Sequence, residues 1–255
     1  MRIGSRREAL CFLIGIGIAL AGVALWAKVH SPTQGLRVVL LNNPEFLADN
    51  PDILQGARNV LQTRALASAV LARRKLIREK WATLTLPAFT PTLGDTKASS
   101  VLIEFTDYSC APCKSSAAIV SAALVKNPDI RVALMFVPTG GAVAEYAARV
   151  AYAAYQQNPA EFAVFHQQLM AEDQPLTQQL VLDAASRAGL DVAQIQEEIS
   201  VPRNRIYIDQ ARMFASDLDL AGVPAFVLNG EIIVGGLTMP KLNRMLSASA
   251  RADAI

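Results

Sequence analysis

Apolar and polar positions divide the chain into a long apolar segment, a helical region and an α/β region. Residues 9–27 form an uncharged run of 19 residues, which as a helix can cross about 30 Å of hydrocarbon. Arg2, Arg6 and Arg7 precede this run, and positive charge on one side favours an amino terminus that stays in the cytoplasm. The pattern therefore predicts a membrane anchor over residues 1–29, with the rest of the chain exported.

Residues 1–29 also fit a signal peptide that is cleaved after export. Ala19-Leu20-Ala21 resembles a small-x-small cleavage site after a short apolar run. The apolar run continues to Trp26, however, and tryptophan suits a membrane interface, so the uncleaved anchor is favoured. In a bacterium the anchor predicts a single-pass protein of the inner membrane with its catalytic domain in the periplasm. Cleavage predicts a soluble periplasmic protein.

Residues 30–42 are expected to form a linker, and residues 43–84 a helical region. Asn43-Pro44-Glu45 and Asn50-Pro51-Asp52 each combine a residue that can cap a helix, a proline suited to the first turn and an acid that complements the dipole. Apolar residues then recur at helical spacing, and the far end is basic. This helix could be a solvated face near the membrane, or it could self-associate and form a homo-oligomer.

Residues 85–99 carry two prolines, a glycine and few large apolar side chains, which is typical of a linker at a domain boundary. The remaining domain, residues 100–250, alternates short apolar runs with helical patterns, and Asn229-Gly230 between two apolar runs is a strong hairpin signal. We expect strand, helix, strand, a helical block, a β-hairpin and a last helix. These elements are expected at residues 101–106, 111–126, 130–137, 142–217, 224–234 and 240–250.

Charge and residue counts exclude several functions. The formal net charge of +2 gives no reason to expect a nucleic-acid partner. Only two histidines are present, so a histidine-rich metal site is excluded. The three cysteines cannot all pair within the chain, and Cys11, inside the apolar run, is interpreted as an apolar thiol. Cys110 and Cys113 would face an oxidising compartment if the chain is exported.

Cys110 and Cys113 are predicted to be a redox pair. Cys110 follows a strand and Cys113 lies in the first turn of a helix, where free N–H groups and the helix dipole stabilise a thiolate. The pKa of Cys110 should therefore lie below about 8.5. Pro112 fits this first turn because it has no N–H to leave unsatisfied. Cys110 would be the exposed nucleophile, and Cys113 would resolve the mixed disulfide.

The pair also has five other interpretations. A zinc site needs about four ligands, and the sequence has no second C-x-x-C. A structural disulfide across so short a loop would restrict the unfolded chain little. A hydrolase using Cys110 with His166 would be disturbed by oxidation with the neighbouring Cys113. A Cu(I)-binding protein is the main alternative function, since soft thiolates select that ion. A membrane-anchored adaptor without turnover is another.

The strand, the C-x-x-C at a helix start and the later Val223-Pro224 before a hairpin together resemble the thioredoxin fold. The stretches that match are VLIEFTDYSCAPC and AGVPAFVLNG. The helical block between them, at about residues 140–218, resembles the DsbA family of thiol:disulfide oxidoreductases. The similarity covers about residues 98–250. It implies an α/β thioredoxin fold with a large helical insertion, cysteine-containing protein substrates, a membrane redox partner and no cofactor.

The resemblance also implies roles for single residues. It implies a cis peptide bond at Pro224, a loop there that binds an extended substrate, and a redox-tuning role for Val223. Glu104 interrupts an apolar strand six residues before Cys110, and it could simply face solvent. The family instead has a buried acid here that relays protons to or from Cys113. Burial would raise the pKa of Glu104 into a useful range near neutrality.

Ala111 and Pro112 leave the direction of electron flow open. DsbA proteins often have Pro-His between their cysteines, whereas Ala-Pro is closer to the Gly-Pro of thioredoxin. DsbA has a reduction potential near about −120 mV and thioredoxin near about −270 mV, and we expect a value between them. Residues 43–71 resemble the amino-terminal helical region of ScsC-like and Com1-like members. That similarity favours self-association through residues 43–84, and with it an isomerase.

Overall fold

The computed structural model describes residues 32–252, with side chains from residue 37 to residue 247. The chain divides into two compact units after Ser68. The expected anchor or signal segment, residues 1–29 with Cys11, lies outside the described residues. Within the described range, none of the helices combines the length and apolar character needed to cross a bilayer.

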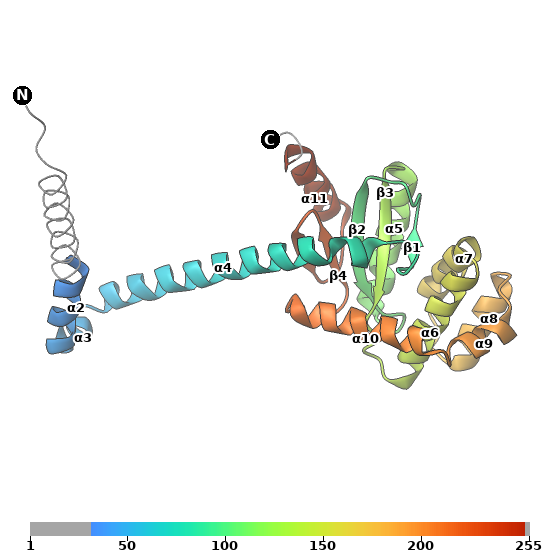
Figure 1. Cartoon of the computed structure of the whole chain (residues 1–255), viewed down its shortest axis with the longest axis horizontal. Coiled ribbons are helices and arrows are strands. Elements are labelled where there is room, and N and C mark those ends of the chain that lie inside the picture. The colour runs from blue at the N-terminus through green and yellow to red at the C-terminus, as the bar shows by residue number, and fades with distance from the viewer. Residues whose placement is uncertain (1–31, 253–255) are drawn as a thin grey trace, which may run out of the picture. The chain divides into compact units, whose positions relative to one another are not determined.

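The first unit is helical. It contains α2 (Pro32–Asn42), α3 (Glu45–Asp49) and the beginning of α4 (Pro51–Thr85) (Figure 1). The segment expected to be a linker over residues 30–42 is thus largely a helix. Its proline at the first helical position and the apolar residues that follow explain why a helix forms there.

Asn43 and Asn50 act differently from the expected amino-terminal caps. Pro44 holds the N-cap position of α3 and makes no capping hydrogen bond through its side chain. The Asn43 amide donates to the carbonyl of Val39 at 2.9 Å, and the Asn50 amide donates to the carbonyl of Phe46 at 2.8 Å. The side-chain amide of each asparagine therefore donates to a carbonyl in the last turn of the preceding helix, and the Val39 carbonyl also accepts from the backbone N–H of Asn43.

A five-stranded mixed sheet of order β1-β3-β2-β4-β5 organises the second unit. The central strand β2 (Ser100–Thr106) runs parallel to β3 (Ile130–Phe136) and antiparallel to β4 (Ala225–Leu228). Helix α5 (Ala111–Lys126) makes the parallel crossover, as the sequence predicted. The predicted hairpin is confirmed: β4 pairs with β5 (Glu231–Val234). Asn229 and Gly230 have φ of 52° and 79°, which a type I′ turn requires.

Helices cover both faces of the sheet. The predicted helical block is confirmed as five helices between β3 and β4, of which four gather at one side of the sheet (Figure 1). One face packs against α5, this cluster and the last helix, while the other packs against the end of α4 and α10. The five helices of the block are α6 (Ala142–Gln157), α7 (Pro159–Ala171), α8 (Gln178–Arg187), α9 (Val192–Glu198) and α10 (Pro202–Asp217). The last helix is α11 (Met239–Ala252).

Residues 85–99 are more than the linker that their composition indicated. They contain β1 (Thr92–Leu93), which pairs antiparallel with β3, and Leu93 packs in the core. Ile77 of α4, 2% exposed, packs against the opposite face of the sheet. The end of α4 and β1 therefore belong to the same compact unit as the cysteines. Two prolines before so short an edge strand, and a glycine directly after it, explain why the sequence resembles a loop.

Candidate active site

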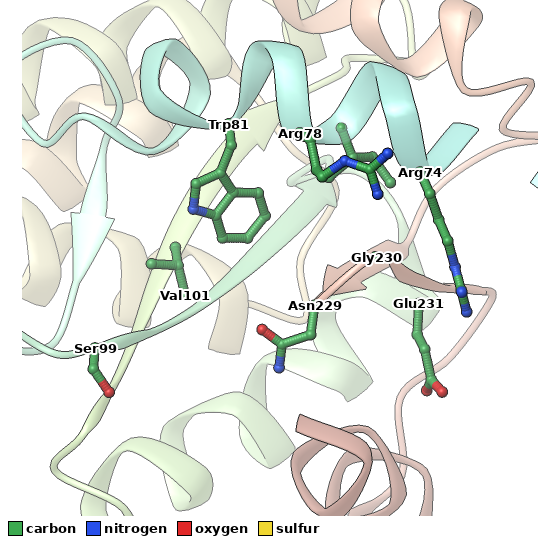
Figure 2. A pocket seen from close by; sticks show the side chains of 9 residues that line it. Arg74, Arg78, Trp81, Ser99, Val101, Asn229, Gly230 and Glu231 are labelled. Carbon is green, nitrogen blue, oxygen red and sulfur yellow. The ribbon is translucent and has the colours of Figure 1, made fainter. Parts of the chain in front are cut away.

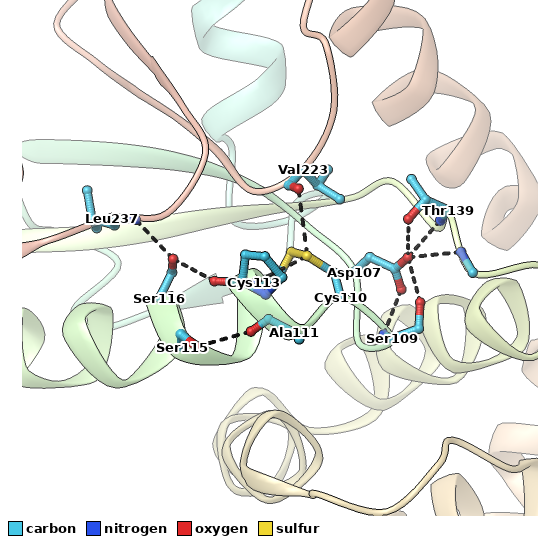
Figure 3. The surroundings of a disulfide bond; sticks show 12 residues. Asp107, Ser109, Cys110, Ala111, Cys113, Ser115, Ser116, Thr139, Val223 and Leu237 are labelled. Atoms are coloured by element: carbon cyan, nitrogen blue, oxygen red, sulfur yellow. Dashed lines mark hydrogen bonds between the residues drawn. A yellow bond between two sulfur atoms is a disulfide. The ribbon is translucent and has the colours of Figure 1, made fainter.

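The two cysteines lie where strand β2 leads into helix α5, and they form a disulfide bond with their Cα atoms 5.2 Å apart (Figure 3). Cys110 is the N-cap residue of α5, and its Sγ accepts a hydrogen bond of 3.1 Å from the backbone N–H of Cys113. Pro112 occupies the first turn, where no N–H is needed. Cys110 is half-buried, whereas Cys113 is fully buried. Only Cys110 offers its sulfur to an incoming thiol.

The loop before β4 closes one side of the disulfide. The peptide bond between Val223 and Pro224 is cis, as the resemblance implied. The carbonyl oxygen of Val223 lies 3.7 Å from Sγ of Cys110 (Figure 3). Residues 113 positions apart in the chain thus meet at the reactive sulfur. Val223 is half-buried, so part of this loop stays accessible beside Cys110.

Ser116 fixes helix α5 to the loop that follows the hairpin. Its hydroxyl donates to the carbonyl of Pro112 at 2.8 Å and accepts from the backbone N–H of Leu237 at 3.0 Å. Ser116 is 1% exposed, so water does not compete for these bonds. The first turn of α5, which carries both cysteines, is therefore held from two directions.

Glu104 is buried in the centre of the sheet, so the expectation of a buried acid is confirmed. It is 1% exposed and pairs with Phe226 on β4. Phe226 belongs to the core on the α5 side, with Val120 of α5. Because paired residues project from the same face, Glu104 lies on the side of the helix that carries Cys113.

The environment of Glu104 makes it a weak acid. Burial raises its pKa from 4.5 to about 7, and the neighbouring Thr106 hydroxyl opposes part of this rise. None of the described residues gives its Oε1 a hydrogen bond. A carboxyl group with a pKa near neutrality can both release and accept a proton at physiological pH.

Asp107 and its partners were not predicted from the sequence. This carboxylate, 2% exposed, accepts hydrogen bonds from Ser109, Thr139 and Gly140 (Figure 3). The bond from the N–H of Ser109 closes a turn of the kind that aspartate favours two residues upstream, and this local pattern could have been found. A Cβ at Gly140 would lie 2.1 Å from Oγ of Ser109, so only glycine fits there. Asp107 thereby joins the loop before Cys110 to the loop after β3.

Tyr108 and His166 form a second buried polar contact that was not predicted. The Tyr108 hydroxyl lies 2.9 Å from Nδ1 of His166 on α7. Burial raises the pKa of Tyr108 well above its usual value and lowers the pKa of His166 to about 4. Both are neutral near pH 7, and with the ring proton on Nε2 the hydroxyl donates to Nδ1. The contact ties the active-site loop to the helical insertion.

The described residues do not offer a ligand set for zinc or copper. Among residues 37–247, no three histidine, cysteine, aspartate or glutamate side chains gather as a group that could hold a metal ion. The sulfur atoms of Cys110 and Cys113 are bonded to each other. The arrangement is instead a dithiol/disulfide couple with one accessible sulfur and one buried sulfur.

Comparison with known proteins supports this description. No curated protein matches the chain. A thioredoxin-like oxidoreductase from Silicibacter pomeroyi DSS-3 is 28% identical, with a TM-score of 0.63 over 67% of this chain and 97% of that one. A ScsC variant from Proteus mirabilis is 20% identical, with a TM-score of 0.66 over 88% and 97%. The thiol-disulfide exchange protein alpha-DsbA2 from Wolbachia pipientis is 20% identical, with a TM-score of 0.65 over 71% and 97%.

The last two similarities concern the fold alone. The family of DSBA-like thioredoxin domains, in contrast, matches residues 101–247 of the sequence itself. That stretch runs from β2 through the cysteines and the helical insertion into α11. The chain therefore belongs to the DSBA-like thioredoxin domain family and is a thiol-disulfide oxidoreductase.

Proposed function

We propose that the protein exchanges disulfides with cysteine-containing proteins, with Cys110 as the attacking sulfur and Cys113 as the resolving sulfur. The observation that carries this assignment is the difference in burial within one disulfide, where Cys110 is half-buried and Cys113 fully buried. A substrate thiol can reach only the first sulfur. The N–H groups at the start of α5 then stabilise the Cys110 thiolate whenever it is released.

Oxidation of a substrate dithiol would proceed in two exchanges. A substrate thiolate attacks Sγ of Cys110, the bond between Cys110 and Cys113 breaks, and Cys113 leaves as a thiolate that takes up a proton. The second substrate thiolate then attacks the substrate sulfur of the mixed disulfide, and Cys110 leaves as a thiolate. The substrate loses two electrons to the cysteine pair. Reduction of a substrate follows the same steps in reverse.

Glu104 is the group we propose to exchange protons with Cys113. It projects from the sheet on the side of α5, and its pKa of about 7 suits transfer in either direction. Cys113 is fully buried, so solvent alone would supply its proton slowly.

Val223 and Pro224 have a different proposed role. Their loop would align an extended substrate segment beside Cys110, because the Val223 carbonyl is already next to the reactive sulfur.

Two serine variants test the assignment of the cysteines. Cys113→Ser should accumulate a mixed disulfide with a peptide that carries a disulfide: the Cys110 thiolate attacks one peptide sulfur, the other peptide sulfur leaves as a thiolate, and no resolving thiol remains. Cys110→Ser should form no such adduct, because Cys113 is inaccessible. Mass spectrometry of the adducts measures both outcomes. Equal trapping by the two variants would overturn the assignment.

The direction of electron flow is a separate proposal, because Ala111 and Pro112 resemble neither typical DsbA nor thioredoxin fully. We expect a reduction potential between about −120 and −270 mV, measured by equilibrating the full chain with glutathione and alkylating the free thiols. A value near the upper limit would identify a disulfide donor that a membrane partner reoxidises. A value near the lower limit would identify a reductase or isomerase.

Self-association and export are also proposed. Helix α4 exposes large apolar side chains in the first unit, including Val60, Leu61 and Leu66, and water-exposed apolar stripes favour helix pairing. An oligomer would place several cysteine pairs around one misfolded substrate. Light scattering of the full chain should give a mass above that of one chain, and a monomer at all concentrations would exclude the idea. Export to the periplasm agrees with the disulfide and with residues 1–29.

A further inference from the structure

A second site lies at the other end of the strands that carry the active site. A cavity of about 700 Å³ is formed by one face of α4, the beginning of β2 and the β4–β5 turn (Figure 2). Strand β2 has seven residues and ends near the cysteines, so the two sites are separated by roughly 20 Å of strand. All residues of the cavity belong to the second unit. Its lining residues are Arg74, Ile77, Arg78, Trp81, Ser99, Val101, Asn229, Gly230 and Glu231.

The register of α4 places these side chains over the sheet. Arg74 lies three residues before Ile77 and four before Arg78, and Trp81 lies four residues after Ile77 and three after Arg78, so all four share one helical face. Ile77 is 2% exposed and packs in the core beneath that face. It anchors the helix, while Arg78 and Trp81 extend toward β2 and the turn (Figure 2). The cavity is thus a built feature of the unit and not a gap between mobile parts.

The cavity has an apolar wall and a polar rim. Trp81 is half-buried and Val101 is 4% exposed, and together with Ile77 they supply aromatic and aliphatic surface. Arg78 and Asn229 supply hydrogen-bond donors around it. Pockets of this size and mixture are typical of sites for small organic molecules.

The charges of the rim distinguish the two arginines. Neither Arg74 nor Arg78 forms an ion pair with a described residue. Arg74 packs on Gly230, whose added Cβ would lie 3.5 Å from its Cγ, and it extends toward Glu231 (Figure 2). Arg78 lies between Arg74 and Trp81, and Glu231, the carboxylate among the lining residues, lies on the side of Arg74 (Figure 2). Arg78 is therefore the cation available to an anionic ligand, next to the apolar wall.

We propose that this cavity binds a small organic anion, with its carboxylate-like head on Arg78 and an aromatic or short aliphatic body on Trp81 and Val101. A guanidinium suits such a head because it donates two parallel hydrogen bonds. The Asn229 amide can add a further donor, whereas the Ser99 hydroxyl already donates to Asp129 at 2.7 Å. This site is independent of disulfide exchange, and its occupant does not meet the cysteines.

Tryptophan fluorescence gives a direct test in the full chain. The chain has two tryptophans, Trp26 and Trp81, so a Trp26→Phe chain reports from the cavity alone. Adding 4-phenylbutyrate should change this fluorescence saturably, with a Kd of about 1 mM or lower. The neutral isostere 4-phenylbutanamide should bind about tenfold more weakly because it lacks the charged head. Acetate, which has no apolar body, should not saturate the signal.

Two variants that each remove one positive charge test whether Arg78 binds the carboxylate of the ligand. Arg78→Gln should raise the Kd for 4-phenylbutyrate about tenfold. Lys80→Gln removes the same charge from the same helix but does not line the cavity, and it should change the Kd less than about twofold. The absence of saturable binding, equal binding of acid and amide, or equal effects of the two variants would each overturn the proposal. So would quenching by vesicles of brominated phosphatidylglycerol without any response to 4-phenylbutyrate, which would indicate a membrane surface instead.

Discussion

Glu104 and Asp107 are two buried carboxyl groups three residues apart in the sequence, but their surroundings differ completely. Asp107, at the end of β2, accepts hydrogen bonds from Ser109, Thr139 and Gly140. Glu104, in the middle of β2, has an Oε1 without a hydrogen bond from any residue between 37 and 247. Asp107 is 2% exposed and Glu104 is 1% exposed, so the extent of burial does not explain why their surroundings differ.

The comparison shows that hydrogen-bond donors decide what a buried carboxyl group can do. Donors around Asp107 replace the water that burial removes, and the group then acts as a structural joint between loops. Glu104 lacks that compensation, and burial raises its pKa to about 7. One carboxyl group therefore positions the active-site loop, and the other is suited to proton transfer.

Removal of the Asp107 carboxylate should have the largest effect on stability. In Asp107→Ala, the N–H groups of Thr139 and Gly140 lose their acceptor inside the protein, and we expect a loss of about 3–5 kcal/mol of unfolding free energy. Urea unfolding of the oxidised protein measures it. Asp173→Ala is the matched control, because Asp173 is exposed, and it should change stability by less than about 0.5 kcal/mol. A loss below about 1 kcal/mol in Asp107→Ala would show that the joint is unimportant.

Glu104→Gln should raise the unfolding free energy, where Asp107→Ala lowers it, and it should do so only above acidic pH. The folded-state pKa of Glu104 is about 7, against 4.5 for a glutamate exposed to water in the unfolded chain. Between these values the unfolded chain ionises while the folded protein stays protonated, so the parent protein loses stability as pH rises. The loss should reach about 3 kcal/mol above pH 7. Glu104→Gln should gain that amount relative to the parent between pH 4.5 and pH 7.

His166 does not disturb this test. Its pKa is lowered by burial to about 4, so its contribution to stability is lost as pH falls from 6.5 to 4, equally in both proteins. Glu197→Gln is the control, because Glu197 is exposed, and its difference from the parent should not vary with pH. If the difference in unfolding free energy between Glu104→Gln and the parent does not vary with pH, Glu104 is ionised in the folded protein. An unchanged pH dependence of the rate at which Cys113 resolves a mixed disulfide on Cys110 in Glu104→Gln would exclude the proton relay.

The sequence predicts one of these carboxyl groups and not the other for a physical reason. Glu104 stands out because a charged residue interrupts an apolar strand, which is a local pattern. Asp107 does not, because the donors on Thr139 and Gly140 lie more than thirty residues away in the sequence. The contact between Tyr108 and His166 spans 58 residues and was missed for the same reason.

The fold shows the same division between local and distant determinants. The helix that starts at the cysteines and the hairpin at Asn229-Gly230 are fixed by local patterns, and both were predicted. Strand β1 was not, because two residues between a proline and a glycine become a strand only by pairing with β3. The cis bond before Pro224 was expected through resemblance to a family. Spacing alone would not have indicated it.

Tyr108→Phe should have the smallest effect and tests whether the tyrosine belongs with Asp107 as a structural residue. The variant leaves Nδ1 of His166 without its buried partner, and we expect a loss of about 1–2 kcal/mol of unfolding free energy at pH 7. Tyr146→Phe is the control, because the half-buried Tyr146 hydroxyl has no hydrogen bond with a described residue, and it should change stability by less than about 0.5 kcal/mol. If Tyr108 is structural, the pH dependence of the rate at which Cys113 resolves a mixed disulfide on Cys110 stays as in the parent while stability falls. A shift of that pH dependence without a loss of stability would instead place Tyr108 beside Glu104, among the groups that handle protons.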